Sequence, residues 1–389
     1  MWFFRCPEFY FGEDSLGQLE ALVGRRAFIV TDANIARLGF VELVQGHLQA
    51  AGMESQVFAE VEPDPSLQTV RRGAAAMEVY GPDWIVGLGG GSSMDAAKAM
   101  WILYERPDVD PAAINPLEDL GLRQKARLIC IPTTAGTGSE AGYAVVLTDT
   151  AEKRKLTLGA REATPDMAIV DPSLTAHLPA QITADTGLDV LSHAIEAYTS
   201  SWANDFTDGL CLQAARMVFA YLPRAVAHGA DDMEAREKMA NAASIAGMTL
   251  GNSQVALAHA MGHSAGAFFK EIPHGRITAL FLPYTIEFAA KGGAGRYLDL
   301  ARALGLAAAD EAEAAVVLAA AVRELMRQIG QPLSLQEAGV DGEALEAVLP
   351  VVCEHMSMDV NTICAGRIPD GDEVERLFRY AFEGRGVDF

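Results

Sequence analysis

The sequence lacks the features typical of nucleic-acid-binding proteins and of membrane proteins. Basic residues are outnumbered, with 30 Lys and Arg against 52 Asp and Glu, and no Lys/Arg cluster offsets the formal charge of −22. Such a surface repels phosphate backbones. No apolar run reaches the roughly 18 residues that a membrane helix needs. We therefore expect neither a nucleic-acid partner nor membrane association.

Cysteine is scarce and its spacing forms no motif. The five cysteines include no CxxC pair, so we expect neither a disulfide framework nor a thiolate zinc site. The opening residues, MWFFRCPEFYFGED, become charged too early for a signal peptide. These features predict a soluble protein of the reducing cytoplasm.

The chain holds enough apolar sequence for two domains, since half of its 389 residues are hydrophobic. Buried strands are expected at 26–32, 83–89, 126–132 and 166–171. Helical patterns alternate with them, which predicts a parallel sheet with helices on both faces. After DPSLTAHLPAQIT the strand signals end and long Ala/Leu/Met-rich stretches predict helices. We expect an α/β domain over 1–175 and an all-α domain over 176–389.

Two glycine- or hydroxyl-rich segments follow expected strands. GLGGGSSMDAAKAM opens a helix, where glycine lets the backbone approach a phosphate and free N–H groups can bind it. It does not match the G-x-G-x-x-G fingerprint, and a tight turn is the alternative explanation. IPTTAGTGSE offers hydroxyl donors suited to a pyrophosphate or ribose, from Thr133, Thr134, Thr137 and Ser139.

Asp32 ends the first clear strand. A carboxylate there can accept hydrogen bonds from an adenosine ribose and would repel a 2′-phosphate. A helix N-cap for ANIARLG explains it equally well. Because open α/β sheets bind ligands at the carboxyl ends of their strands, the three elements together predict a dinucleotide site.

Acidic and histidine residues recur at helical spacing in the second half. Asp189 and His193 are four residues apart, and His259 and His263 repeat that spacing before His274. One carboxylate with several imidazoles suits Fe²⁺ or Zn²⁺. Single pairs of this kind also occur on helix surfaces. The spacing alone does not choose between His259 and His263 as a ligand.

Four segments in this order resemble the iron-containing (group III) alcohol dehydrogenases: GLGGGSSMDAAKA, IPTTAGTGSE, DVLSHAIEAYTS and HAMGHSAGAFFKEIPHG. The resemblance covers nearly the whole chain. It implies the dehydroquinate synthase-like fold, with catalysis in a cleft between the dinucleotide-binding domain and the helical domain. The implied reaction is metal-assisted hydride transfer between a primary or small alcohol and NAD(H), with an aldehyde or ketone as product.

The resemblance also implies roles for individual residues. It places the metal on Asp189, His193, His259 and His274, with His263 beside it as an acid–base group or, alternatively, a packing residue. Implied cofactor contacts are Asp32, Asp64, Gly90, Gly91, Ser92, Thr133, Thr134, Thr137, Ser139, Lys155 and Leu178.

Two features depart from the family pattern. Asp64 stands where the family commonly has asparagine, and the interval from His263 to His274 is one residue longer. The longer interval would reshape a substrate pocket beside Phe268 and Phe269.

Several other activities share this pattern. A hydroxyacid–oxoacid transhydrogenase or a zinc glycerol dehydrogenase would keep the same sites. A dehydroquinate synthase would need more basic residues than Lys270 and Arg276 near the site. A non-catalytic metal-binding protein is the alternative outside enzymes. We expect NAD and Fe²⁺, with Zn²⁺ as the other metal, and a homo-oligomer, as a dimer.

Overall fold

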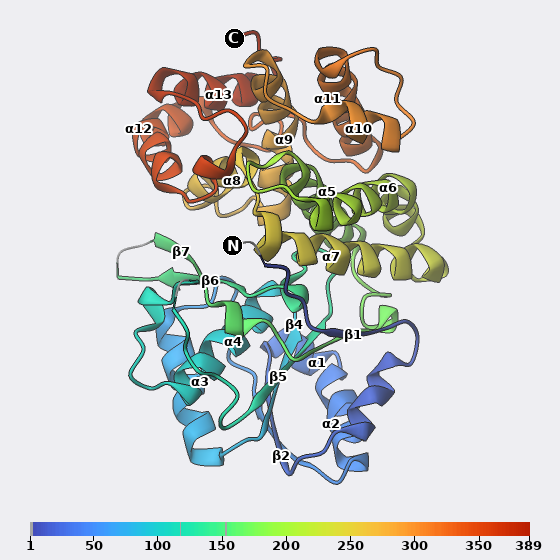
Figure 1. Ribbon diagram of the computed structural model, residues 1–389, viewed down its shortest axis with the longest axis vertical. Coiled ribbons are helices and arrows are strands. Elements are labelled where there is room, and N and C mark those ends of the chain that lie inside the picture. The colour runs from blue at the N-terminus through green and yellow to red at the C-terminus, as the bar shows by residue number, and fades with distance from the viewer. Residues whose placement is uncertain (1–2, 117, 152–153) are drawn as a thin grey trace. The chain divides into compact units, whose positions relative to one another are not determined.

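The chain divides between His177 and Leu178 into an α/β unit and an all-helical unit. The computed structural model describes residues 3–116, 118–151 and 154–389. Figure 1 shows the strands in the first unit and only helices in the second. The predicted fold class is confirmed.

A six-stranded sheet forms the centre of the N-terminal unit. Its strands run parallel in the order β1-β8-β5-β4-β2-β3. Their bounds are β1 Glu8–Phe11, β2 Arg26–Val30, β3 Glu54–Phe58, β4 Trp84–Gly89, β5 Arg127–Pro132 and β8 Met167–Val170. The four strands expected from the sequence are β2, β4, β5 and β8. Their parallel arrangement brings the loops that follow β2, β4 and β5 to one edge of the sheet.

Helices cover both faces of this sheet. Successive residues of a strand point to opposite faces; accordingly Phe28 and Val30 belong to one apolar core and Ile29 to the other. The first core contains residues of α3 and α4, and the second contains residues of α2 and the short helix η1. The bounds are η1 Ser15–Ala21, α1 Ala33–Arg37, α2 Phe40–Ala50, α3 Leu67–Tyr80 and α4 Gly91–Glu105.

An antiparallel hairpin stands apart from the parallel sheet. It pairs β6 Ala144–Asp149 with β7 Arg154–Gly159. The Thr148 N–H donates to the Pro65 carbonyl over 2.8 Å, which fixes the hairpin to the segment before α3. The remaining short helices of this unit are η2 Pro111–Ala113, η3 Ser139–Ala141, η4 Arg161–Ala163 and η5 Pro172–Leu174.

The C-terminal unit is built around α5, most of which is buried. This helix packs against α6, α7 and α9. Gly187 permits the approach of α6, since a Cβ there would lie 2.2 Å from a methyl carbon of Leu222. The bounds are α5 Ala180–Thr199, α6 Asp205–His228, η6 Gly229–Asp231, α7 Met233–Ser253, α8 Leu257–Gly266, α9 His274–Lys291, α10 Tyr297–Ala303, α11 Glu311–Gln328, α12 Gly342–Met358, η7 Thr362–Cys364 and α13 Gly371–Glu383.

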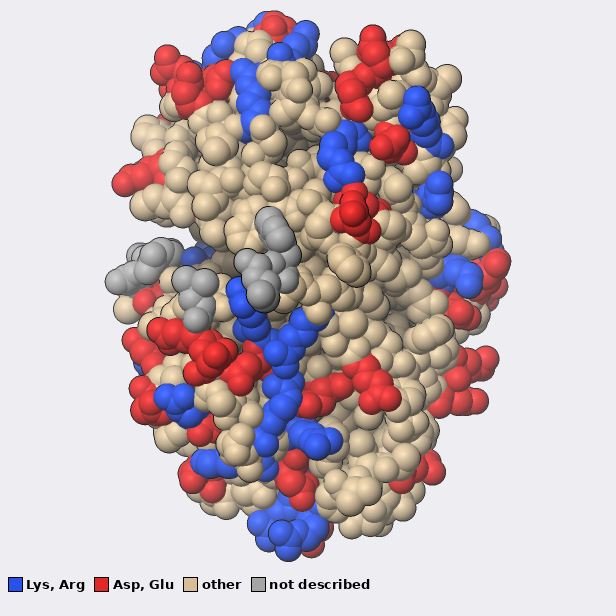
Figure 2. Space-filling model, in the orientation of Figure 1, with Lys and Arg blue, Asp and Glu red and all other residues tan. Residues whose placement is uncertain are grey.

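Charged residues of both signs are scattered over the face seen in Figure 2, between larger areas of uncharged residues. A band of Lys and Arg crosses the N-terminal unit and is flanked by Asp and Glu. Among the described residues, no helix combines the length and apolar composition that crossing a bilayer requires. All five cysteines are free thiols.

Candidate functional site

One face of α5 carries a line of polar side chains. Asp185, Asp189, His193 and Glu196 follow one another at spacings of four, four and three residues, which places them along one side of the helix. All four are buried. Because burying charged groups is costly unless partners compensate them, this face indicates a functional centre.

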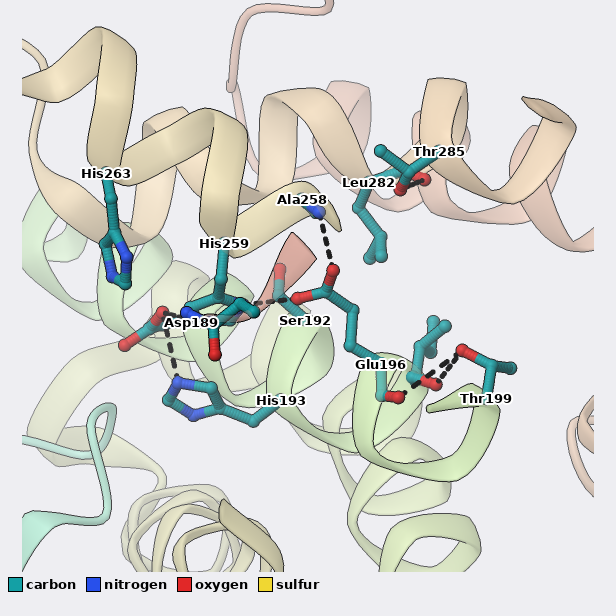
Figure 3. A network of polar contacts seen from close by, with 12 residues as sticks. Asp189, Ser192, His193, Glu196, Thr199, Ala258, His259, His263, Leu282 and Thr285 are labelled. Carbon is teal, nitrogen blue, oxygen red and sulfur yellow. Dashed lines mark hydrogen bonds and ion pairs between the residues drawn. The ribbon is translucent and has the colours of Figure 1, made fainter. Parts of the chain in front are cut away.

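Three histidines gather around one oxygen of Asp189. Its Oδ1 lies 3.6 Å from Nε2 of His193, 3.7 Å from Nε2 of His259 and 3.8 Å from Nε2 of His274. Asp189 and His193 come from α5, His259 comes from α8, and His274 begins α9. Figure 3 shows the side chains of Asp189, His193 and His259 directed toward one another.

Asp189, His193 and His259 fit a divalent metal ion, and Nε2 of His274 also lies 3.8 Å from Oδ1 of Asp189. The distances are too long for hydrogen bonds, and Oδ1 of Asp189 and Nε2 of His259 are buried without a hydrogen-bond partner among the described residues. Ligand atoms about 2.1 Å from a shared tetrahedral metal stand about 3.4 Å apart. Asp189, His193 and His259 each offer a ligand atom within 4.8 Å of the others. An ion between them would satisfy Oδ1 of Asp189 and Nε2 of His259, which have no hydrogen-bond partner in the part of the chain that the structure describes.

Burial and mutual charge set the protonation of these side chains. Burial alone would raise the pKa of Asp189, but His193, His274 and His259 lower it overall. Burial lowers the pKa of His193 to about 4. Burial would also lower the pKa of His259, but the charges of Glu196 and Asp189 raise it to about 9. Asp189 and His193 therefore already have the forms that ligate a metal, whereas His259 must lose a proton to do so.

Glu196 fixes the orientation of His259. Its carboxylate pairs with Nδ1 of His259 and accepts the Ala258 N–H over 2.6 Å. Both contacts appear as dashed lines in Figure 3. With Nδ1 engaged, Nε2 is the nitrogen that faces Asp189, as expected where a carboxylate orients a metal-binding histidine.

The start of α9 is held close to α5. Arg276 donates from Nε and Nη2 to the two carboxylate oxygens of Asp185, each over 2.9 Å. A Cβ on Gly275 would lie 2.2 Å from the Asp185 carbonyl oxygen, so only glycine allows this approach. Both contacts position His274, whose side chain is 36% exposed, at the edge of the centre.

His263 lies beside the centre. Its ring centroid is 6.0 Å from that of His259 and 5.3 Å from that of His274. Its Nδ1 lies 2.9 Å from Oδ2 of Asp359, the residue that follows α12. Among the described residues, the histidines with a nitrogen within 4.0 Å of Asp189 are His193, His259 and His274.

The loop after β4 leaves a helix N-terminus open. Gly90 is the N-cap of α4, and no described side chain caps it. A Cβ on Gly91 would lie 2.8 Å from Cγ2 of Thr137, and one on Gly90 would meet Thr134 at 3.6 Å. The two loops predicted to bind phosphate therefore pack against each other, and the free N–H groups of the first turn of α4 suit an anion.

The hydroxyl groups of the loop after β5 differ in their surroundings. Oγ1 of Thr133 is buried without a hydrogen-bond partner among the described residues. Oγ1 of Thr137 accepts the Ser139 N–H over 3.2 Å. The Ser139 hydroxyl donates to Asp95 over 2.6 Å and accepts from the buried Lys98 over 2.9 Å. Ser139 is thus engaged in holding its loop on α4.

The remaining predicted contacts lie at three places. Asp32 is the N-cap of α1, with Oδ1 accepting the Asn34 and Ile35 N–H groups, and its Oδ2 accepts from Ser93 over 3.4 Å. Asp64, Ser92 and Lys155 form a second group, in which Lys155 pairs with Asp64 over 2.9 Å. Leu178 belongs to the C-terminal unit, where its carbonyl accepts from Arg236.

Family models match almost the whole chain. Residues 6–172 match the iron-containing alcohol dehydrogenase model, and residues 183–382 match the model of the C-terminal part of the Fe-containing alcohol dehydrogenase family. The chain belongs to the iron-containing alcohol dehydrogenase family.

Individual relatives agree with this membership. The NADPH-dependent butanol dehydrogenase of Clostridium saccharobutylicum is 38% identical over 98% of this chain and 98% of its own. Aldehyde-alcohol dehydrogenase 2 of Entamoeba histolytica is 39% identical over 98% of this chain but only 46% of its own. A crystal structure of a 1,3-propanediol oxidoreductase superposes with a TM-score of 0.90 at 33% identity, covering 98% of this chain and all of that one.

This membership confirms the predicted alcohol dehydrogenase activity. The chain is an alcohol dehydrogenase with a nicotinamide cofactor and a His/Asp metal site. The residues predicted to bind the metal all lie in the C-terminal unit of this alcohol dehydrogenase, and those predicted to bind the cofactor lie in the N-terminal unit, apart from Leu178.

Sequence reasoning missed several residues of this alcohol dehydrogenase's site. Glu196 and Asp185 lie on the same face of α5 as Asp189, so helical periodicity extended by one turn in each direction finds them. Asp359 lies 96 residues from His263. No local pattern links those two residues, and only the fold identifies the pair.

Proposed function

We propose that the enzyme interconverts small primary alcohols and their aldehydes, using Fe²⁺ held by Asp189, His193, His259 and His274 and NAD(H) as hydride carrier. The observation that carries the proposal is the convergence of three imidazole Nε2 atoms on a buried carboxylate oxygen that has no hydrogen-bond partner among the described residues. When bound, the metal supplies Lewis-acid polarisation of the substrate oxygen. Zn²⁺ generally binds such donors more tightly than Fe²⁺, so metal supply decides which ion is loaded.

The protein's own task is orientation. Glu196 holds His259 with Nε2 inward, and Arg276 and Gly275 hold the start of α9 so that His274 completes the ligand set. We assign proton transfer to Nε2 of His263, because Asp359 engages its Nδ1. We do not assign His263 to the metal, because a further protein ligand would compete with substrate for a position there.

The assignment of the cofactor rests on the loops at the carboxyl edge of the sheet. The open first turn of α4, at Gly90, Gly91 and Ser92, suits the pyrophosphate. The acid at Asp32 favours NAD(H), because its charge would repel a 2′-phosphate. The butanol dehydrogenase relative is named as NADPH-dependent, so similarity to it does not indicate NAD(H). Our assignment of NAD(H) therefore rests on Asp32. We assign further contacts to Asp64, Thr133, Thr134, Thr137, Ser139, Lys155 and Leu178.

Apolar side chains near His263 favour an alkyl substrate. Phe268 is 38% exposed and stacks on His355 with ring centroids 5.9 Å apart. Met358 and Val360 are exposed on either side of Asp359, the partner of His263. A short aliphatic chain can contact these groups, whereas a diol or hydroxyacid would leave polar atoms unpaired against them. The relative named for butanol agrees with this preference, whereas the similar structure is named for 1,3-propanediol, a diol, so the substrate screen must include diols.

A substrate screen tests the proposal. We expect the protein, loaded anaerobically with Fe²⁺ or Zn²⁺, to reduce NAD⁺ with linear primary alcohols and to oxidise NADH with their aldehydes. His274→Ala is the matched control and should lose both metal and activity. Exchange between a hydroxyacid and an oxoacid without net change in free cofactor would instead identify a transhydrogenase. Full metal content in His274→Ala would show that the ligand assignment is wrong.

A further inference from the structure

Asp64 connects the start of α4 with the β6–β7 hairpin. Its φ of 55° lies in the left-handed region, which Asp and Asn adopt more readily than other residues with a side chain. In this conformation its backbone N–H donates to Oγ of Ser92, in the first turn of α4, over 3.3 Å. Its Oδ1 accepts from Nζ of Lys155 over 2.9 Å.

Lys155 is held in reach of this position by the hairpin. It lies opposite Thr148 in the β6–β7 register, and the Thr148 N–H donates to the carbonyl of Pro65, next to Asp64. The Lys155 side chain is 25% exposed, whereas that of Asp64 is 57% exposed. The Lys155 side chain is therefore partly shielded from solvent, and Asp64 links it to the first turn of α4, where a diphosphate would bind.

We propose that Asp64 lowers the affinity of the enzyme for its cofactor by neutralising Lys155. The inference rests on the proposed function, in which the first turn of α4 binds the diphosphate and Lys155 contacts the cofactor. An anion that approaches Ser92 meets a lysine already paired and a carboxylate beside it. Binding must then break the ion pair and overcome the repulsion of Asp64. A weaker complex releases its cofactor faster, which raises turnover where release is the slow step.

Calorimetric titration with ADP tests this directly, using the full, metal-loaded chain at low and high salt. Asp64→Asn keeps the size of the side chain and its tolerance of the left-handed conformation. We expect it to bind ADP roughly 3- to 10-fold more tightly than wild type. Its affinity should also depend more steeply on salt, because a free ammonium then contributes to binding. Lys155→Met should bind ADP more weakly than wild type. Adding Asp64→Asn to Lys155→Met should increase the ADP affinity by a smaller factor than Asp64→Asn increases it in wild type.

Glu60→Gln is the charge-matched control. Glu60 lies on the same connection between β3 and α3, but pairs with Arg72 over 3.1 Å at an exposed site. Its removal should change the ADP affinity by less than about twofold. If Asp64→Asn binds ADP no more tightly than wild type, the inference is wrong and the cofactor site stands. If it binds more weakly, Asp64 serves to anchor the hairpin. If wild type binds neither ADP nor NAD⁺, both the cofactor site and this inference are wrong.

Discussion

His263 contacts the rings of two proposed metal ligands, yet its own partner is Asp359. The ring distances place His263 next to His259 and His274. Because Nδ1 of His263 pairs with Asp359, Nε2 is the ring nitrogen that points away from that carboxylate. We predict that His263→Ala keeps most of its metal and NAD⁺ affinity and loses roughly 10²-fold in kcat, the usual contribution of a positioned acid–base group. Metal analysis, NAD⁺ titration and steady-state kinetics measure the three quantities.

Asp359→Asn separates orientation from packing. The amide keeps the shape of the side chain but removes its charge, so we expect a smaller loss of kcat than in His263→Ala, with metal content unchanged. Near-normal turnover in His263→Ala would show that His263 is a packing residue. Lost metal in that variant would show that it is a ligand.

Asp32 has two tasks that a single substitution can distinguish. Its Oδ1 caps α1, while Oδ2 accepts a long hydrogen bond from Ser93, over 3.4 Å. We predict that Asp32→Gly reduces the preference for NAD⁺ over NADP⁺, measured as the ratio of kcat/KM values, by about tenfold or more, because one close charge is removed. Asp32→Asn is the matched variant that retains an N-cap without the charge. Equal wild-type efficiency with both cofactors would contradict this role.

At the scale of elements, the contact between α5 and α9 depends on a missing side chain. A Cβ on Gly275 would meet the backbone oxygen of Asp185 at 2.2 Å and Cβ of Asp189 at 2.9 Å. We predict that Gly275→Ala displaces the start of α9, lowers the metal content and destabilises the fold by about 1–3 kcal/mol. Elemental analysis and chemical denaturation measure the two effects.

Gly209, in the exposed face of α6, provides the control. A Cβ there would have no atom within 4 Å, so Gly209→Ala should keep the metal and stabilise the protein by roughly 0.5–1 kcal/mol, as alanine favours a helix interior. If Gly275→Ala retained metal and stability, the approach of the two helices would not position His274.

The strands that the sequence predicts are those buried in the middle of the sheet. All six residues of β4 are buried, so its apolar run is continuous. β1 and β3 form the two edges of the sheet and have partly exposed side chains, which breaks the run that would identify them. The same limit applies to the site: Asp189 and His193 share a helix and are predictable, whereas the pairing of His263 with Asp359 depends on the fold.

For the whole molecule, the division into two units predicts which part of the chain a bound metal stabilises. The proposed ligands all lie in the C-terminal unit, on α5, α8 and α9. We predict that removing the metal with a chelator lowers Tm and increases amide hydrogen exchange in those helices. Metal present at 100 times its Kd would contribute about 2.7 kcal/mol to the native state.

Exchange in the buried strands β4 and β5 provides the internal reference and should be unchanged by the chelator. Protection lost equally from those strands would show that the metal stabilises the chain as one cooperative body. Restored protection in the three helices after Fe²⁺ or Zn²⁺ is added back would exclude damage by the chelator.

The proposed metal ligands come from three helices, α5, α8 and α9, and this has a consequence for the unfolded chain. A metal shared by Asp189 and His274 is a reversible cross-link that closes a long loop through α6, α7 and α8. In a covalent cross-link, closing a loop of about 85 residues is worth about 4–5 kcal/mol by chain entropy. Metal supply would thus act on this enzyme much as oxidation acts on a secreted protein, deciding how long the folded chain survives as well as whether it turns over substrate.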